Sequence, residues 1–262
     1  MGTQSAATMP SEYLAFDLET SGVDKANDVP VSFALVHFST EEGAVPTINH
    51  KIVNPGIPIP KGAMAIHGIT DERAQAEGIP LQEAVLEVAE ALIDASSRGV
   101  PVVGYNVAYD LGMIDACLKR IDGRGLQARG WKGPVLDPLV LDRHLVRFRK
   151  GSRKLADACT HYGVTNSAAH DAEGDALASL QVFLAMREMF PQLKTCSAEE
   201  LTVLQREWYK SWALSFNKFL TIKQKPLIAD DEARYWPLGS PDVPPDFSEQ
   251  VVPAPSTEPD QP

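Results

Sequence analysis

Hydrophobic and polar positions along the first third of the chain predict three strands. The segments 12–19, 29–39 and 48–53 are rich in aliphatic residues and are bounded by turn-forming residues. Two further short strands are expected at 100–105 and 134–140, each next to stretches with helical periodicity. Three initial strands followed by alternating helices and strands predict an α/β fold with a mixed sheet.

Helical periodicity, with apolar residues three or four positions apart, predicts a series of helices between and after these strands. The Pro- and Gly-rich segment 54–62 predicts a loop. The last helix begins at Ser197 and Glu200, which have the spacing of a capping box. Its apolar stripe predicts packing on the main domain rather than binding of a partner. The expected helices are 71–77, 81–95, 106–121, 153–162, 171–189 and 197–220, and the stripe consists of Leu201, Leu204, Trp208, Trp212, Phe216 and Phe219.

Composition divides the chain into four parts. Residues 1–10 predict a flexible N-terminus, residues 11–191 a main domain, and residues 192–236 a helical extension packed on that domain. Residues 237–262 contain eight prolines, several acids and few apolar residues, which is typical of a disordered tail.

Composition and charge also exclude several classes of protein. With 44% hydrophobic and 23% charged residues, the 262-residue chain has a globular composition. Its net charge of −11 argues against a protein that coats nucleic acid by bulk charge. The three cysteines form no CxxC pair, the first residues do not resemble a secretory signal, and no apolar run approaches 18 residues. These features predict a cytoplasmic protein without a membrane span.

Two carboxylates lie close together at the end of the first predicted strand. Asp17 and Glu19 point to the same side because strand side chains alternate between the two faces. Neighbouring carboxylates repel each other, so they need solvent or a cation between them. A solvated strand end would be a sufficient explanation for this pair alone.

Further acidic positions strengthen the case for a cation. Asp110 lies in the first turns of a predicted helix that Asn106 could cap. In the segment HDAEGD, His170 and Asp175 are five positions apart, and Asp175 lies too far into its helix to be explained by capping. Carboxylates with one imidazole and no thiolate suit Mg²⁺ or Mn²⁺. Two such ions can clamp a phosphodiester during hydrolysis, while a nearby histidine accepts the proton of the attacking water.

Taken together, these motifs resemble the DnaQ-like DEDDh 3′–5′ exonucleases. FDLETSG at 16–22, IHGIT at 66–70, NVAYD at 106–110 and HDAEGD at 170–175 occur in the order of that family. The family includes the proofreading epsilon subunit of bacterial DNA polymerase III, and the whole chain is most similar to actinobacterial exonuclease-domain proteins. The resemblance implies a ribonuclease H-like fold, with a mixed five-stranded sheet whose second strand is antiparallel.

The resemblance also implies a role for each candidate catalytic residue. Asp17, Glu19 and Asp175 would bind the ion that activates water, and Asp17 would bridge to a second ion. The cofactor would therefore be two Mg²⁺ or Mn²⁺ ions in one active site. Asp110 would act mainly through a metal-bound water. His170 would be the general base, because its spacing from Asp175 is that of the histidine variant of the family.

Two features depart from the family pattern. Tyr105 stands where many members carry a histidine, and we interpret it as a packing residue. Asp171 and Glu173 place additional negative charge beside His170. If these carboxylates lie close to the imidazole, they raise its pKa and move the activity to higher pH.

The terminal nucleotide is expected to contact four residues. The resemblance implies contacts from Thr20, Ile66 and His67, and we add Asn106 from the same set of motifs. No sequence-reading module such as a zinc finger is evident, so recognition of a specific base sequence is not expected.

A basic segment offers a second region for substrate binding. Residues 143–154 contain six Lys or Arg residues and no acid. We expect Arg147, Arg149 and Lys150 to hold the phosphate backbone of a single strand. A solvated basic surface in an acidic protein is the alternative interpretation.

The sequence thus predicts a metal-dependent 3′–5′ exonuclease that releases nucleoside 5′-monophosphates from single-stranded nucleic acid. We expect DNA as the substrate, with a DNA polymerase as a possible partner. One alternative is an RNA-trimming enzyme of the same family. Another is a non-catalytic module that binds nucleic acid or assists a polymerase. The presence of all five expected catalytic residues argues against it, because a binding module does not need such a cluster of charges. These residues are Asp17, Glu19, Asp110, His170 and Asp175.

Overall fold

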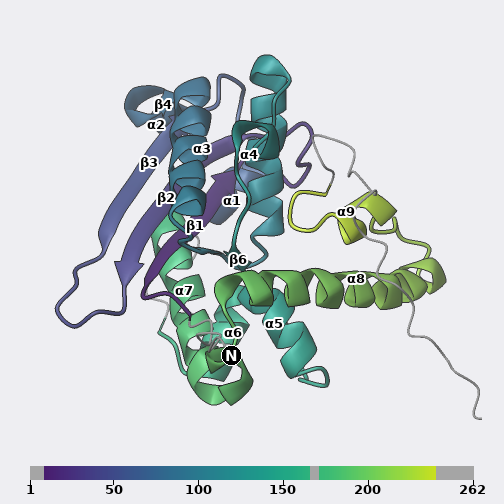
Figure 1. Ribbon diagram of the computed structural model, residues 1–262. Helices are drawn as coiled ribbons and strands as arrows, with labels where there is room; N and C mark the ends of the chain where they lie inside the picture. Colours follow the sequence, from purple (N-terminus) through teal and green to yellow (C-terminus); the bar gives the residue numbers. More distant parts are fainter. Residues whose placement is uncertain (1–8, 166–170, 240–262) are drawn as a thin grey trace, which may run out of the picture.

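The computed structural model of the protein describes residues 9–165 and 171–239. Its strands are β1 (Glu12–Thr20), β2 (Pro30–Ser39), β3 (Thr47–Asn54), β4 (Ile79–Pro80), β5 (Val102–Val103) and β6 (Val135–Leu136). Within the described residues they form a six-stranded sheet in the order β4-β3-β2-β1-β5-β6 (Figure 1). β2 is antiparallel to both β1 and β3, whereas β5 is parallel to β1 and to β6.

Helices cover both faces of this sheet. They are α1 (Lys61–His67), α2 (Asp71–Glu77), α3 (Leu81–Ser97), α4 (Ala108–Asp122), α5 (Pro138–Leu145), α6 (Leu155–Tyr162), α7 (Ala172–Met189), α8 (Ala198–Ile222) and α9 (Asp230–Arg234), with 3-10 turns at Gln127–Arg129 and Pro191–Lys194. α3 and α4 pack on one face, and α7 packs on the other (Figure 1). None of the helices in the described ranges is both long and apolar enough to cross a membrane.

The alternation of side chains along β1 decides which residues face which helix. Leu14 and Phe16 belong to the hydrophobic cluster that includes α3 and α4. Ala15 belongs to the cluster that includes α7. Because residues two positions apart share a face of a strand, Asp17 and Glu19 point to the α7 side of the sheet. The packing of the core therefore orients both carboxylates toward one helix.

Most predicted elements are present, with ends shifted by a few residues, and the α/β fold with an antiparallel second strand is confirmed. The number of strands is six rather than five, because the two-residue strand β4 pairs with β3. Three helices were not predicted, and α9 in the C-terminal extension is one of them. α1 follows the Pro-rich loop directly, and α5 replaces most of the strand expected at 134–140. In α5, Pro138 occupies the first turn and the Asp137 side chain accepts a hydrogen bond from the Leu139 N–H, so this short helix is stabilised locally.

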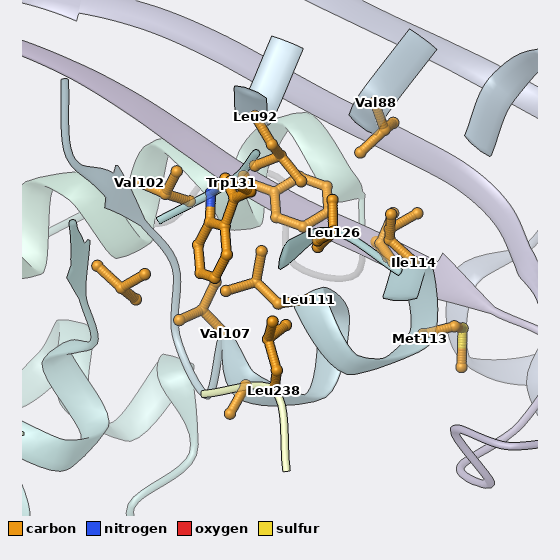
Figure 2. Packing of buried hydrophobic residues seen from close by; sticks show 14 of the residues in the cluster. Val88, Leu92, Val102, Val107, Leu111, Met113, Ile114, Leu126, Trp131 and Leu238 are labelled. Carbon is orange, nitrogen blue, oxygen red and sulfur yellow. The ribbon is translucent and has the colours of Figure 1, made fainter. Parts of the chain in front are cut away.

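The chain after α8 completes the larger hydrophobic core. Trp236 is 1% exposed, and Pro237 and Leu238 are buried as well. Figure 2 shows Leu238 beside Leu111 and Val107, in the cluster that also includes α4. Residues 237 and 238 were predicted to belong to the disordered tail, but they are buried in this core. The many prolines after residue 236 made these buried positions hard to recognise in the sequence.

Helix α8 packs on the domain as predicted, but the face that it turns to the core only partly coincides with its apolar stripe. Leu201 is buried, and Trp208 and Trp212 pack half-buried on the core. Leu204 and Phe219 are exposed, whereas Thr202 and Gln205 are buried. The reason is β6, which forms the edge of the sheet. Gln205 Nε2 donates to the Val135 carbonyl at 2.8 Å, and Thr202 Oγ1 accepts from the Val135 N–H at 2.9 Å. Polar side chains of α8 are thus buried because they form hydrogen bonds with backbone groups of the edge strand.

Candidate active site

Three carboxylates converge where β1 ends. Asp17 and Glu19 come from β1, and Asp175 comes from the first turn of α7. One carboxylate oxygen from each residue lies within 4.8 Å of the other two. We call these residues the carboxylate trio. The trio joins two segments that are more than 150 positions apart in the sequence, as the order of the motifs predicts.

Burial and crowding raise the pKa values of carboxyl groups in the trio. The pKa of Asp17 lies well above its ordinary range, mainly because of burial and then because of the charges of Asp110 and Asp175. Burial, followed by the charges of Asp175 and Asp171, raises the pKa of Glu19 to about 7. A divalent cation among these oxygens would offset both the burial of charge and the repulsion that raise these pKa values.

Asp110 lies next to the trio without forming part of it. It is 5% exposed and occupies the first turn of α4. Its pKa is raised, mainly by burial and also by the neighbouring charge of Asp137. Of the charges that act on Asp17, that of Asp110 has the largest effect. Asp110 therefore adds a further negative charge beside the trio without being one of its three members.

The loop between β5 and α4 approaches β1 unusually closely. A Cβ atom on Gly104 would lie 2.7 Å from the Phe16 carbonyl oxygen, so glycine is required there. Asn106 does not cap α4 as expected. Its φ of 62° is left-handed, and its N–H donates to Asp137 Oδ1 at 3.0 Å. Tyr105 packs in the domain as expected, and its O–H donates to the Arg153 carbonyl at 2.8 Å.

Two of the residues expected to contact the terminal nucleotide, Thr20 and His67, lie at the end of β1. Thr20 Oγ1 lies 3.2 Å from the Tyr109 hydroxyl, which also bonds to the Gly22 carbonyl. Burial lowers the pKa of His67, and a hydrogen bond with the Thr20 backbone partly offsets this effect. Ile66 is 60% exposed at the end of α1. Tyr109 was not predicted as a site residue, although it stands immediately before Asp110 in the motif NVAYD.

His50 on β3 is another residue that the sequence did not reveal. Its Nε2 lies 3.5 Å from Asp171 Oδ1, and its Nδ1 lies 3.6 Å from Glu173 Oε2. Asp171 precedes α7 but makes no side-chain cap to that helix. His170, the expected general base, lies outside the described residues, and its role stays a prediction.

The basic segment separates into exposed and internally paired side chains. Asp142 is fully buried and accepts a hydrogen bond from Arg149 Nη2 at 3.1 Å and another from Arg153. Arg149 is therefore held inside the domain, because it compensates a buried charge. Arg147 and Lys150 are exposed, so they are free to meet a phosphate backbone.

The chemistry of the donors fits the predicted cofactor. The trio and Asp110 offer carboxylate oxygens without thiolates, which is the ligand type that Mg²⁺ and Mn²⁺ prefer. Raised pKa values mean that the charged carboxylates are unfavourable in the metal-free protein. Asp17, Glu19 and Asp175 are therefore the residues that could hold a divalent cation.

The chain is similar in sequence to known forms and relatives of DNA polymerase III. A DNA polymerase III subunit epsilon-like protein from Rhodobacter capsulatus is 30% identical over 192 residues, which cover 70% of this chain and 24% of that protein. A PolC-type DNA polymerase III from Caldanaerobacter subterraneus is 29% identical over 213 residues, which cover 78% of this chain and 14% of that protein. The chain thus spans less than a quarter of the length of these relatives.

Solved structures show the same fold. Exonuclease I from E. coli, in complex with a 5cy-dT13 oligonucleotide, has a TM-score of 0.61 and 20% sequence identity, and the match covers 79% of this chain and 46% of that one. The sequence model of the exonuclease family matches residues 14–183, a range that contains the complete carboxylate trio. The chain belongs to the exonuclease family, with a DnaQ-like domain of ribonuclease H-like fold.

Proposed function

We propose that this protein is a metal-dependent 3′–5′ exonuclease that removes nucleoside 5′-monophosphates from single-stranded DNA. The convergence of Asp17, Glu19 and Asp175 within 4.8 Å, inside a domain of the exonuclease family, is the observation that carries the proposal. Two Mg²⁺ or Mn²⁺ ions, when bound, supply the activation of water and the stabilisation of the leaving oxygen.

The residues of the chain contribute binding, orientation and proton transfer. Asp17 and Glu19 are held by β1 and Asp175 by α7, so the ligand positions are set by rigid elements. Asp110 supports them from the first turn of α4. His170 would accept the proton of the attacking water. Thr20, Ile66 and His67 would hold the last nucleotide against the end of β1.

The names of similar proteins support DNA as the substrate. Exonuclease I was solved in complex with single-stranded DNA, and the sequence relatives are a DNA polymerase III subunit epsilon-like protein and a PolC-type DNA polymerase III. We therefore infer DNA rather than RNA, a DNA polymerase as a possible partner, and a role in the cytoplasm of a bacterial cell.

An end-labelled oligonucleotide tests the proposal. DNA and RNA strands labelled at the 5′ end are incubated with Mg²⁺, with Mn²⁺ or with chelator. We expect a metal-dependent ladder that shortens from the 3′ end, faster on DNA. Because a metal supplies several kcal/mol of transition-state stabilisation, Asp17→Ala should slow the reaction about 10³-fold or more. Asp24→Ala, which removes an exposed acid from the loop after β1, is the matched control.

Each failure of this experiment has a defined meaning. Faster degradation of RNA would show that RNA rather than DNA is the preferred substrate, and the proposed metal-dependent hydrolysis would stand. No ladder on either strand with either metal would overturn the proposal in favour of a non-catalytic module that binds nucleic acid. Equal rates for Asp17→Ala and the parent would remove the carboxylate trio from the mechanism.

A further inference from the structure

A cavity of about 680 Å³ lies between α5 and α8, and the carboxylate trio does not line it. Its volume is in the range of pockets that hold small molecules or a nucleotide. We call it the α5–α8 cavity. The residues that characterise it are Arg143, His144 and Arg147 on one side, with Trp208, Trp212 and Phe216 on the other.

Aromatic and cationic groups are stacked along the wall of this cavity. The Arg143 guanidinium lies 3.6 Å from the centre of the Trp212 ring. The His144 ring stacks on Trp208, with 4.0 Å between ring centres and 9° between planes. Trp212 in turn stacks on Phe216 at 5.1 Å. Flat rings with cations between them offer the stacking surfaces and phosphate contacts that single-stranded nucleic acid requires.

The charge of the cavity is opposite to that of the protein as a whole. Arg143, Arg147 and Arg153 line it, whereas none of its described lining residues is acidic. The carboxylate of Asp142 pairs with Arg153 and so compensates its charge. For Arg143 and Arg147, no ion pair forms within the described parts of the chain. A cavity with this excess of positive charge, in a protein with a net charge of −11, favours an anionic ligand.

The helix α5, which forms one wall of the cavity, begins next to the motif that carries Asp110. Asp137 caps α5 and accepts the N–H of Asn106, which lies in the motif that ends at Asp110. From Asp137 the axis of α5 leads to Arg143, about 9 Å further along the helix. α8, which forms the opposite wall, lies beyond the residues that the exonuclease model matches. The cavity is therefore a feature that the C-terminal extension adds to the domain.

We propose that the α5–α8 cavity binds the single-stranded DNA substrate a few nucleotides upstream of its 3′ end. This inference rests on the proposed function. A base would stack among the rings of α8, and the adjoining phosphates would meet Arg143 and Arg147. The cavity would thus add affinity for longer strands without touching the bond that is cleaved.

Two exposed serines in the wall of the cavity can be replaced by charged residues that repel phosphate, and these replacements do not affect the buried core. Ser211 and Ser215 line the cavity, are exposed, and stand one turn apart on α8. Ser211→Glu with Ser215→Glu introduces two negative charges. Ser211→Gln with Ser215→Gln adds side chains of the same size without charge. Arg147→Gln removes one cation from the cavity, and Lys218→Gln removes one from an exposed position of α8 that does not line it.

Binding is measured on the full chain with a 5′-labelled DNA strand of about 20 nucleotides, in chelator so that no hydrolysis occurs. Fluorescence anisotropy should show at least a ~10-fold weaker Kd for the Glu pair than for the Gln pair, with a flatter salt dependence. Arg147→Gln should weaken binding in the same direction, and Lys218→Gln should match the parent. Equal Kd values for the Glu and Gln pairs would overturn the proposal.

Hydrolysis with Mg²⁺ separates this inference from the proposed function. The Glu pair should raise the KM for the long strand much more than the KM for a dinucleotide, which has no phosphate upstream of the bond that is cleaved. An equal increase for both substrates would contradict an upstream binding site. If the parent cleaves neither substrate, the proposed function fails, while the anisotropy comparison still decides whether DNA binds in the cavity.

Discussion

At the scale of single residues, the surroundings of a buried acid decide its role. Asp142 is fully buried but is compensated by Arg149, Arg153 and the Tyr162 hydroxyl at 2.6 Å. Asp17, in contrast, is surrounded by further carboxylates that raise its pKa. The first arrangement stabilises the fold, whereas the second becomes favourable when a cation binds.

Glu19 makes the stability of the metal-free protein dependent on pH. Its pKa is about 7 in the folded protein and 4.5 ordinarily, so the folded state binds the proton more tightly than the unfolded chain. Its stabilising contribution is therefore complete below pH 4.5 and is lost as the pH rises to about 7. In chelator, Glu19→Gln should thus gain Tm relative to the parent between pH 5 and pH 7, as measured by thermal denaturation. A difference that is constant across this pH range would contradict the prediction.

Asp142 provides a test of the buried ion pairs. Asp142→Ala leaves the guanidinium groups of Arg149 and Arg153 without their partner, so the free energy of unfolding should fall by about 3–5 kcal/mol. Urea denaturation measures the change. Asp122→Ala, which removes the exposed partner of Arg129, is the control and should cost at most about 1 kcal/mol. Similar losses for the two variants would show that the buried ion pairs of Asp142 contribute no more to stability than an exposed ion pair.

The acidic residues of the site could be predicted because their spacing reflects local structure. Asp17 and Glu19 share a face of one strand, and Asp175 lies in the first turn of a helix whose start was recognisable. Their neighbours could not be predicted, because they depend on contacts between distant segments. His50 meets Asp171 across the sheet, and Asn106 meets Asp137 between two loops.

At the scale of elements, length decides what periodicity can predict. β1, β2 and α7 extend over eight residues or more, and their patterns were sufficient. β4 has two residues, too few for any alternation to be visible. The orientation of α8 was only partly predictable from its apolar stripe, because the polar Gln205 is 0% exposed and bonds to β6.

Gln205 tests how α8 is attached to the edge of the sheet. Its Oε1 accepts the Asp137 N–H at 2.7 Å, and its Nε2 donates to the Val135 carbonyl at 2.8 Å. Gln205→Leu leaves the Asp137 N–H without its acceptor and removes one of the two donors to the Val135 carbonyl, since Thr202 Oγ1 is the other at 3.0 Å. We therefore expect a loss of about 1–3 kcal/mol in the free energy of unfolding. Glu207→Leu, on the exposed side of α8, serves as the control. A stability equal to that of the control would mean that the helix is held by apolar packing alone.

At the scale of the whole molecule, the family domain and the C-terminal extension share one core. The exonuclease model ends at residue 183, yet Tyr209, Ala213, Trp236 and Leu238 belong to the same buried cluster as α3 and α4. The division at residue 191 predicted from the sequence therefore separates two parts that pack together. The extension also forms half of the α5–α8 cavity.

Truncation tests this dependence. A chain that ends at residue 196 exposes the surface that α8 and Trp236 cover, so it should lose its cooperative thermal transition or aggregate. A chain that ends at residue 239 keeps the complete described core and should melt close to the Tm of the parent. A cooperative transition in the shorter chain would show that the family domain folds without its extension.

Calorimetric titration with Mn²⁺ tests the central claim most directly, that the carboxylate trio is a divalent-cation site. We predict binding of two ions by the parent near pH 7, with release of protons, because the cation displaces the proton from Glu19. Asp17→Asn should abolish most of this heat, and Asp24→Asn should not change it. The absence of binding by the parent, or undiminished binding by Asp17→Asn, would contradict the claim.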